Sequence, residues 1–234
     1  GPTGPYGFGG RFVRLPSPFF FGGGTMEILT PTITAHGRVL VERGSAEAPA
    51  LVGFHGYAQN AEDMLTELRA LPGLEAWTRV SVQAPNRFYA RGDSKVVASW
   101  MTRQDRELAI ADNIAYVQRA LVDAKVSRAV FVGFSQGVAM AYRAALRSGV
   151  HAAGVIALAG DIPPELKDEP AHTWPRVLIG VGDREEWYSA EKLQADEAFL
   201  VSIGVPHQVV RFTGGHDWTE EFRAAAAAWA LSVA

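Results

Sequence analysis

The 234-residue chain contains no cysteine, which excludes disulfide bridges, a thiolate nucleophile and any zinc or iron–sulfur site held by cysteine. It also has no excess of positive charge, since 22 Lys and Arg residues stand against 25 Asp and Glu residues. Such a balance offers no basic field for nucleic acid or an anionic membrane surface. No apolar run reaches the ~18 residues of a membrane span. We therefore expect a cytoplasmic globular protein, an enzyme or a small-molecule-binding protein.

The first 25 residues differ in composition from the rest of the chain. They are rich in Gly, Pro and Phe, and only Arg11 and Arg14 are charged. No apolar stretch follows a basic start, so the segment lacks the pattern of a signal peptide. We expect residues 1–25 to be an added or upstream extension with Met26 as the natural start. The alternative is that the phenylalanines at 19–21 dock into an apolar groove.

From residue 36 onward, short apolar runs alternate with helical patterns. The runs predict strands at 38–42, 51–55, 79–83, 129–134, 155–159, 176–181 and 208–212, and helices at 62–77, 105–124, 190–203 and 219–232. Thr102 and Asp105 suggest a capping box before the second helix. The stretch 87–99 is irregular and is either a mobile flap or an exposed loop. Strands that alternate with long helices require right-handed crossovers and a mostly parallel sheet. We predict one α/β domain over residues 26–234, with helices on both faces of the sheet and no separate lid domain.

The most informative motif is Gly-Phe-Ser-Gln-Gly at residues 133–137. It lies where an apolar strand meets a helical pattern, which is the context of a nucleophile elbow. There the strand turns sharply into the helix and holds the serine hydroxyl exposed. The two glycines remove side chains that would collide with neighbouring backbone. The motif therefore predicts Ser135 as a catalytic nucleophile.

A serine nucleophile needs a histidine base, which elbow-type hydrolases carry after the serine and after the acid in chain order. Four histidines follow Ser135, and His216 is the one that comes after the last strand and just before the C-terminal helix. Gly214 and Gly215 permit the bend that would carry its imidazole back over the sheet. We expect His216 to be the base.

The acid of the triad should end an intermediate strand. Asp183 directly follows the strand at 176–181 and its closing glycine, and is our expected acid. Asp161 follows the strand at 155–159 and remains the alternative.

The oxyanion of an acyl-transfer reaction needs at least two backbone donors. One expected donor is the N–H of Gln136, the residue after the nucleophile. Gly56, at the end of an early strand, would let the backbone present the N–H of Tyr57 as the other. His55 precedes the serine in the chain, so we expect it to brace this loop.

Five large side chains fall on or near the loops that should surround the triad: Trp100, Met101, Trp187, Tyr188 and Trp218. We expect them to wall an apolar and rather short acyl pocket. The alternative is that they pack helices onto the sheet. A small uncovered site favours short-chain esters.

The chain resembles the phospholipase/carboxylesterase family of α/β-hydrolases, which includes acyl-protein thioesterases and small bacterial carboxylesterases. The matching pieces span residues 50–220 in order: Phe54-His55-Gly56, Ala84-Pro85-Asn86, Ser99-Trp100-Met101, Gly133-Phe134-Ser135-Gln136-Gly137, Gly182-Asp183 and Gly215-His216. The resemblance implies the α/β-hydrolase fold, Ser135, Asp183 and His216 as triad, and an oxyanion hole at Tyr57 and Gln136. It also implies hydrolysis of esters or thioesters without a cofactor or metal.

Two positions depart from the family pattern. Val138 stands where relatives commonly carry glycine, and residues 184–188 read Arg-Glu-Glu-Trp-Tyr instead of a Pro-Val-type segment. The second departure argues against transferring substrate preference from the thioesterases. The chain also resembles dienelactone hydrolases, but those enzymes use a cysteine nucleophile, which this chain lacks.

These features predict a serine hydrolase that cleaves a small-molecule ester, with a short acyl group, through an acyl-enzyme. A thioesterase or lysophospholipase for longer acyl chains is the alternative. A peptidase, a C–C-bond hydrolase or a perhydrolase would use the same triad, and a non-catalytic binding protein on the same fold is the remaining alternative. The sequence leaves the natural substrate and the oligomeric state open.

Overall fold

The computed structural model describes residues 26–234, so the predictions for the first 25 residues lie outside the described part of the chain. The chain divides into two units, residues 1–35 and residues 36–234. The described residues of the first unit, 26–35, form no helix or strand and are exposed. All helices and strands described below belong to the second unit.

The second unit is built on a seven-stranded sheet in the order β1-β3-β2-β6-β7-β8-β9. Only β1 runs antiparallel to its neighbour, and the other pairs are parallel. The central strands are buried on both faces, which explains their unbroken apolar sequences. The strands are β1 (Val39–Glu42), β2 (Ala50–Phe54), β3 (Arg79–Val82), β6 (Arg128–Phe134), β7 (His151–Leu158), β8 (Arg176–Gly182) and β9 (His207–Phe212).

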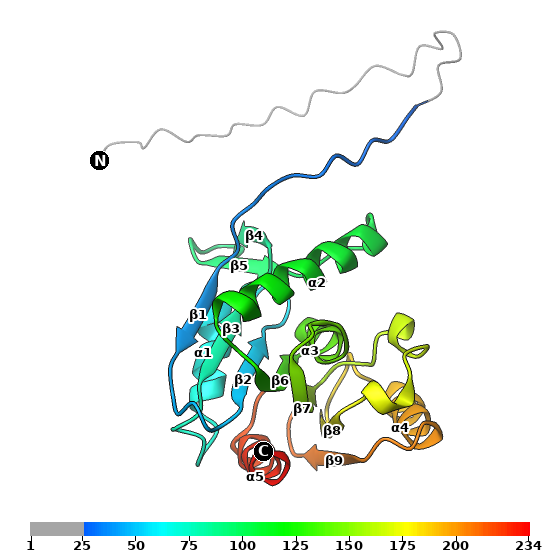
Figure 1. The fold of residues 1–234 in the computed structure, drawn as a ribbon. Helices are drawn as coiled ribbons and strands as arrows, with labels where there is room; N and C mark the ends of the chain where they lie inside the picture. Colours follow the sequence, from blue (N-terminus) through cyan, green and yellow to red (C-terminus); the bar gives the residue numbers. More distant parts are fainter. Residues whose placement is uncertain (1–25) are drawn as a thin grey trace. The chain divides into compact units, whose positions relative to one another are not determined.

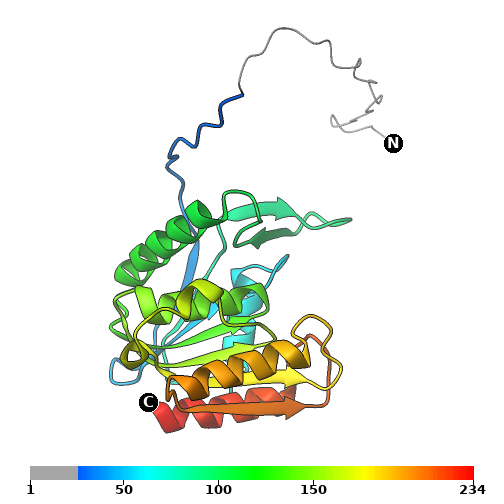
Figure 2. The ribbon, with the colours of Figure 1, turned by 90° about the vertical axis from the view of Figure 1, so that its right-hand side faces the viewer.

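Helices cover both faces of this sheet (Figures 1 and 2). On one face, α1 (Ala61–Arg69) and α5 (Glu220–Val233) enclose an apolar cluster that includes Leu68 and Phe222. On the other, α2 (Arg106–Asp123), α3 (Gln136–Arg147) and α4 (Ala190–Ser202) enclose a second cluster. The prediction of a mostly parallel α/β sheet with helices on both faces is therefore confirmed.

One predicted helix boundary and one predicted helix cap are wrong. The first helix ends at Arg69 and not at residue 77, because Pro72 cannot continue a helix and Gly73 adopts φ +80°. At the start of α2, Asp105 makes no side-chain capping hydrogen bond and adopts a left-handed φ of 48°. Thr102 instead accepts the N–H of Gln104 within the preceding turn.

The stretch predicted as irregular, 87–99, contains a β-hairpin. Its strands β4 (Asn86–Tyr89) and β5 (Val96–Ser99) form a separate two-stranded antiparallel sheet, seen at the top of Figure 2. The turn passes through Gly92 at φ +78°, a conformation that glycine adopts without steric cost. Within residues 26–234 no separate lid domain is present.

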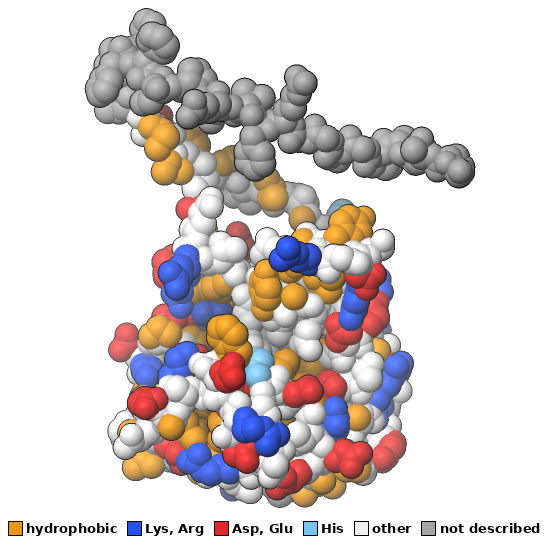
Figure 3. All heavy atoms as spheres, turned by 180° about the vertical axis from the view of Figure 1, so that it is seen from behind, with side chains coloured by type: hydrophobic (Ala, Val, Ile, Leu, Met, Phe, Trp, Pro, Cys, Tyr) orange, Lys and Arg blue, Asp and Glu red, His pale blue; other side chains and the backbone are white. Residues whose placement is uncertain are grey.

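The surface of the described residues carries charges of both signs. Figure 3 shows one face, on which basic and acidic side chains are interspersed with apolar ones. No helix within residues 26–234 is both long enough and apolar enough to cross a membrane.

One buried carboxylate joins α4 to the loops at the end of the sheet. Asp196 is 3% exposed and accepts hydrogen bonds from the N–H of Ile162 and the hydroxyl of Tyr188, both at 3.0 Å. Burial disfavours the charged form and raises the pKa of Asp196 from 3.8 to about 6, although both hydrogen bonds oppose the shift.

This raised pKa predicts a specific pH dependence of stability. A carboxyl group whose pKa is higher in the folded than in the unfolded state stabilises the fold fully below pH 3.8, and this contribution is lost as pH rises through about 6. We expect the free energy of unfolding of the wild type, relative to Asp196→Asn, to fall between pH 4 and pH 7. Urea unfolding of both proteins across this range measures the difference, and parallel pH profiles would contradict the prediction.

Candidate active site

The centre of the site is the turn from β6 into α3, where Ser135 adopts φ 53° and ψ −121°. A non-glycine residue at positive φ is strained and persists only where its surroundings hold it. Here the N–H of Ser135 donates to the carbonyl of Leu158 at the end of the neighbouring strand β7, at 2.9 Å. The strain is that expected of a nucleophile elbow.

The glycines on either side of Ser135 are required by close backbone contacts. A Cβ on Gly133 would lie 2.5 Å from Cα of Val138, and one on Gly137 would lie 2.0 Å from the carbonyl oxygen of Phe54. No side chain fits at either position, which explains the motif in steric terms.

His216 comes from the loop between β9 and α5 and reaches Ser135. Its Nε2 lies 2.7 Å from the Ser135 Oγ, and its ring packs at 5.0 Å from the Phe134 ring. The side chain is 25% exposed, so the imidazole borders solvent while one edge is held by the protein. The structure thus brings together the serine and the histidine that the sequence predicts.

The carboxylate that contacts His216 is Glu185. Its two oxygens lie 2.8 and 2.9 Å from Nδ1 of His216, and its side chain is 2% exposed. A carboxylate can only accept, so this contact fixes the ring proton on Nδ1 and leaves Nε2 free to accept from the Ser135 hydroxyl. The N–H groups of Trp187 and Tyr188 also donate to Glu185, at 2.7 and 3.1 Å.

The prediction that Asp183 would meet the histidine is therefore corrected. The Asp183 side chain is 55% exposed, and its Oδ1 accepts the N–H of Gly214 at 2.9 Å. Because Asp183 directly follows β8, its short side chain connects this strand end to the loop after β9 and does not reach the imidazole. Asp161, the alternative, is 54% exposed and lies 3.8 Å from Lys192, away from His216.

A signal for Glu185 was present in the sequence. Elbow-type hydrolases use either Asp or Glu as the acid, and Glu185 lies within the segment that departs from the family pattern. Its position three residues after the end of β8, with one more methylene than Asp, lets it reach back to the histidine.

The expected oxyanion donors come from two segments that meet at Ser135. The Gln136 N–H is the first of α3 and so has no acceptor within the helix. Gly56 lies so close that a Cβ added there would be 3.3 Å from the Ser135 Cβ. Tyr57, whose side chain is 63% exposed, follows Gly56 in this loop.

His55 braces the loop from beneath, as the chain order predicts. It is fully buried, with its Nδ1 2.7 Å from the carbonyl of Gly56, while its Nε2 accepts the N–H of Ala84 at 3.0 Å. Burial lowers the pKa of His55, in keeping with a neutral, structural imidazole.

The Gln136 side chain has a positioning role that the sequence analysis missed. Its Oε1 accepts the N–H of Trp100 at 2.9 Å, and its Nε2 donates to the carbonyl of Met101 at 3.0 Å. The indole N–H of Trp100 donates in turn to the carbonyl of His55. These bonds hold the Trp100–Met101 segment against the elbow.

Four of the five predicted wall residues, Trp100, Met101, Trp187 and Tyr188, line a pocket of about 260 Å³ that also includes Ser135. Trp218 does not line it. It is 6% exposed and packs between Phe134 and Phe222, so it belongs to the core.

The pocket is less apolar than predicted. Three charged residues, Arg143, Asp161 and Lys192, contribute to its lining. Asp161 and Lys192 are about half exposed, whereas the Arg143 side chain is 3% exposed.

The comparisons with known proteins agree with this fold. Solved structures similar to the chain include the carboxylesterase of Bacillus cereus (17% identity, TM-score 0.67, covering 86% of this chain and 96% of the other). Esterase PE8 has 19% identity and a TM-score of 0.69 over 86% of this chain and 100% of the other. Acyl-protein thioesterase 2 of Zea mays has 20% identity and a TM-score of 0.66 over 85% of this chain and 99% of the other. No curated protein matches the chain in sequence.

The family model described as Phospholipase/Carboxylesterase matches residues 36–179, which is more than half of the chain and includes the elbow. The resemblance drawn from the sequence is thereby confirmed, and the chain belongs to the phospholipase/carboxylesterase family of α/β-hydrolases.

Proposed function

We propose that the protein is a serine hydrolase that cleaves carboxylic esters with short acyl groups, using Ser135, His216 and Glu185 as its triad. The main support for the proposal is a chain of two hydrogen bonds through His216. The Ser135 Oγ lies 2.7 Å from Nε2 of His216, and Nδ1 of His216 lies 2.8 Å from the Glu185 carboxylate. This is the arrangement that turns a weakly nucleophilic hydroxyl into an attacking group.

In the proposed reaction, the Ser135 Oγ attacks the ester carbonyl carbon while Nε2 of His216 takes the hydroxyl proton. Glu185 stabilises the imidazolium through Nδ1. The N–H groups of Tyr57 and Gln136 hold the oxyanion, and each such donor contributes about 3–4 kcal/mol to the transition state. The alcohol then leaves with the proton from Nε2, and water repeats the sequence on the acyl-enzyme.

The size of the pocket supports a short acyl group. Its volume of about 260 Å³ is below the ~300–1,000 Å³ typical of ligand pockets. An acyl thioesterase is the second candidate, favoured by the similarity to a solved acyl-protein thioesterase, because a thioester presents the same carbonyl to the same triad.

The first prediction concerns turnover and chain length. A p-nitrophenyl ester series from acetate to palmitate should show the highest kcat/KM at short acyl chains for the wild type. The Ser135→Ala variant should lose this turnover while its circular dichroism spectrum stays unchanged. Wild-type turnover by the variant would contradict the proposal, and a maximum at long chains would favour the thioesterase or lysophospholipase alternative.

The second prediction separates the two acidic residues of the β8 loop. Glu185→Gln should lower kcat by roughly 10³–10⁴-fold, because an amide no longer holds the imidazole in the right tautomer. Asp183→Asn, the matched control on the same loop, should change kcat by less than about tenfold, since its hydrogen bond goes to Gly214. The reverse ranking in p-nitrophenyl acetate kinetics would restore Asp183 as the acid.

A further inference from the structure

A buried arginine forms part of the pocket wall. Arg143 lies on α3, eight residues after Ser135, which corresponds to roughly 12 Å along the helix axis. Ala139, halfway between them, also lines the pocket, so the three residues share one side of the helix. Long side chains on a helix lean toward its N-terminus. The Arg143 guanidinium therefore leans back toward the nucleophile.

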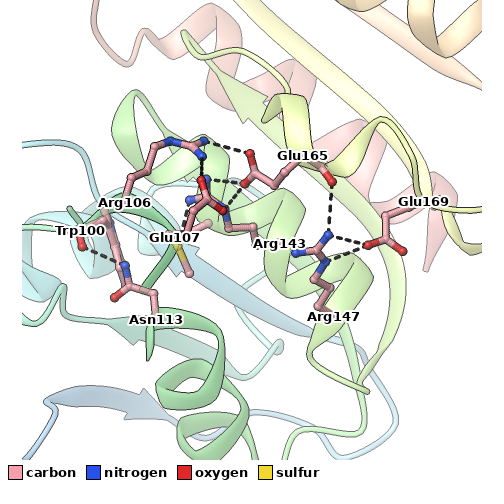
Figure 4. Close-up of polar contacts among 9 residues, drawn as sticks. Trp100, Arg106, Glu107, Asn113, Arg143, Arg147, Glu165 and Glu169 are labelled. Atoms are coloured by element: carbon pink, nitrogen blue, oxygen red, sulfur yellow. Dashed lines mark hydrogen bonds and ion pairs between the residues drawn. The ribbon is translucent and has the colours of Figure 1, made fainter. Parts of the chain in front are cut away.

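The guanidinium of Arg143 is only partly satisfied by its protein partners (Figure 4). Its Nε and Nη2 both donate to Oε1 of Glu165, at 2.9 and 2.7 Å. Its Nη1 is 3.7 Å from the Met140 sulfur, a weak acceptor. The second oxygen of Glu165 accepts from Arg106 at 2.9 Å. Glu165 thus contacts two guanidinium groups, of which Arg106 has a second carboxylate partner in Glu107, at 2.9 Å.

The three arginines of this cluster are matched by three glutamates, because Arg106 also pairs with Glu107 at 2.9 Å and Arg147 pairs with Glu169. What distinguishes Arg143 is its burial and the lack of an oxygen acceptor for Nη1. Burial lowers the pKa of Arg143, and Glu165 opposes this shift, while Arg106 and Arg147 add to it. A buried guanidinium N–H group that has only a weak sulfur acceptor forms a stronger hydrogen bond when an anionic oxygen is brought to it. The other two charged lining residues, Asp161 and Lys192, lie 3.8 Å apart, so their charges offset each other.

The position of His216 indicates which part of an ester occupies this pocket. The histidine delivers the proton to the leaving alcohol, so the alcohol must lie on its side of Ser135. His216 does not line the pocket, whereas Ser135 and Gln136 do. The acyl part of the substrate then extends along α3 toward Arg143.

We propose that the acyl group carries a terminal carboxylate that binds Arg143, so that the preferred substrates are half-esters of short dicarboxylic acids. The carboxylate accepts from Nη1, the guanidinium nitrogen without an oxygen partner. This inference rests on the proposed function, because it assigns the acyl side from the roles of Ser135 and His216. The acyl pocket would then not be purely apolar, because Arg143 would select acyl groups that end in a negative charge.

The experiment compares matched charged and neutral esters. Ethyl hydrogen succinate, glutarate and adipate are each paired with a neutral ethyl ester in which an isopropyl group replaces the carboxylate, and released ethanol is measured. For at least one pair, the wild type should favour the half-ester in kcat/KM. Arg143→Met should reduce that ratio by roughly 10- to 100-fold, the range of a hydrogen bond to a charged group.

The chain offers a matched control on the same helix. Arg147 also pairs with a glutamate, Glu169, and also contacts the carbonyl of Glu165, but it does not line the pocket. Arg147→Met should leave the ratio unchanged. If Arg143→Met does not fold, Arg143→Lys should still lower the ratio, because Lys keeps the charge but not the forked donors.

Three results would overturn the inference: a wild-type preference for the neutral ester in every pair, an unchanged ratio in the folded Arg143 variants, or an equal loss in Arg147→Met. Failure to hydrolyse any of these ethyl esters, with Ser135-dependent turnover of p-nitrophenyl acetate intact, would overturn it as well. Absence of all Ser135-dependent turnover would instead mark the failure of the proposed function.

Discussion

The strained turn at Ser135 is the constraint on which the rest of the site depends. It holds a non-glycine residue at φ 53° between the end of β7, which accepts its N–H, and the end of β2, whose carbonyl excludes a side chain at Gly137. Such backbone strain persists because several contacts with the surrounding sheet hold the residue in this conformation at once. The parallel strands bring their carboxyl ends to one edge, where later loops can converge on the serine.

The convergence is completed by hydrogen bonds from residues far apart in the chain. Glu185 is buried and accepts two backbone N–H groups of its own loop, so its position does not depend on the histidine alone. The Gln136 side chain fixes the Trp100–Met101 segment, which lines the pocket. Because each of these groups is held by other contacts, the site is organised without substrate.

The fold and the two central residues could be predicted from the sequence because they follow from local patterns. Continuous apolar runs indicated the buried strands, and the glycine spacing around Ser135 reflected steric contacts of the backbone. His216 could be predicted from its position in the chain, after the last strand and before the C-terminal helix. These features depend on neighbours in sequence or on the direction of parallel strands.

The identity of the carboxylate beside His216 and the polarity of the pocket could not be predicted, because they depend on details that no local sequence pattern shows. Asp183 and Glu185 differ by two positions in one tight turn, and only the path of that turn decides which carboxylate faces the imidazole. The hairpin at 86–99 lacked an alternating pattern of sufficient length. The burial of Arg143 depends on Glu165, which lies in the three-residue 3₁₀ segment Pro164–Leu166, too short to show a periodic pattern in the sequence.

Site-selective reaction of Ser135 with a fluorophosphonate tests the central claim most directly. Labelling located by mass spectrometry on the intact protein should find one adduct, on Ser135, in the wild type. In His216→Ala the adduct should be lost or strongly slowed, because the hydroxyl no longer has its base. An unlabelled Ser135 in the folded wild type, or equal labelling rates in the two proteins, would contradict the account.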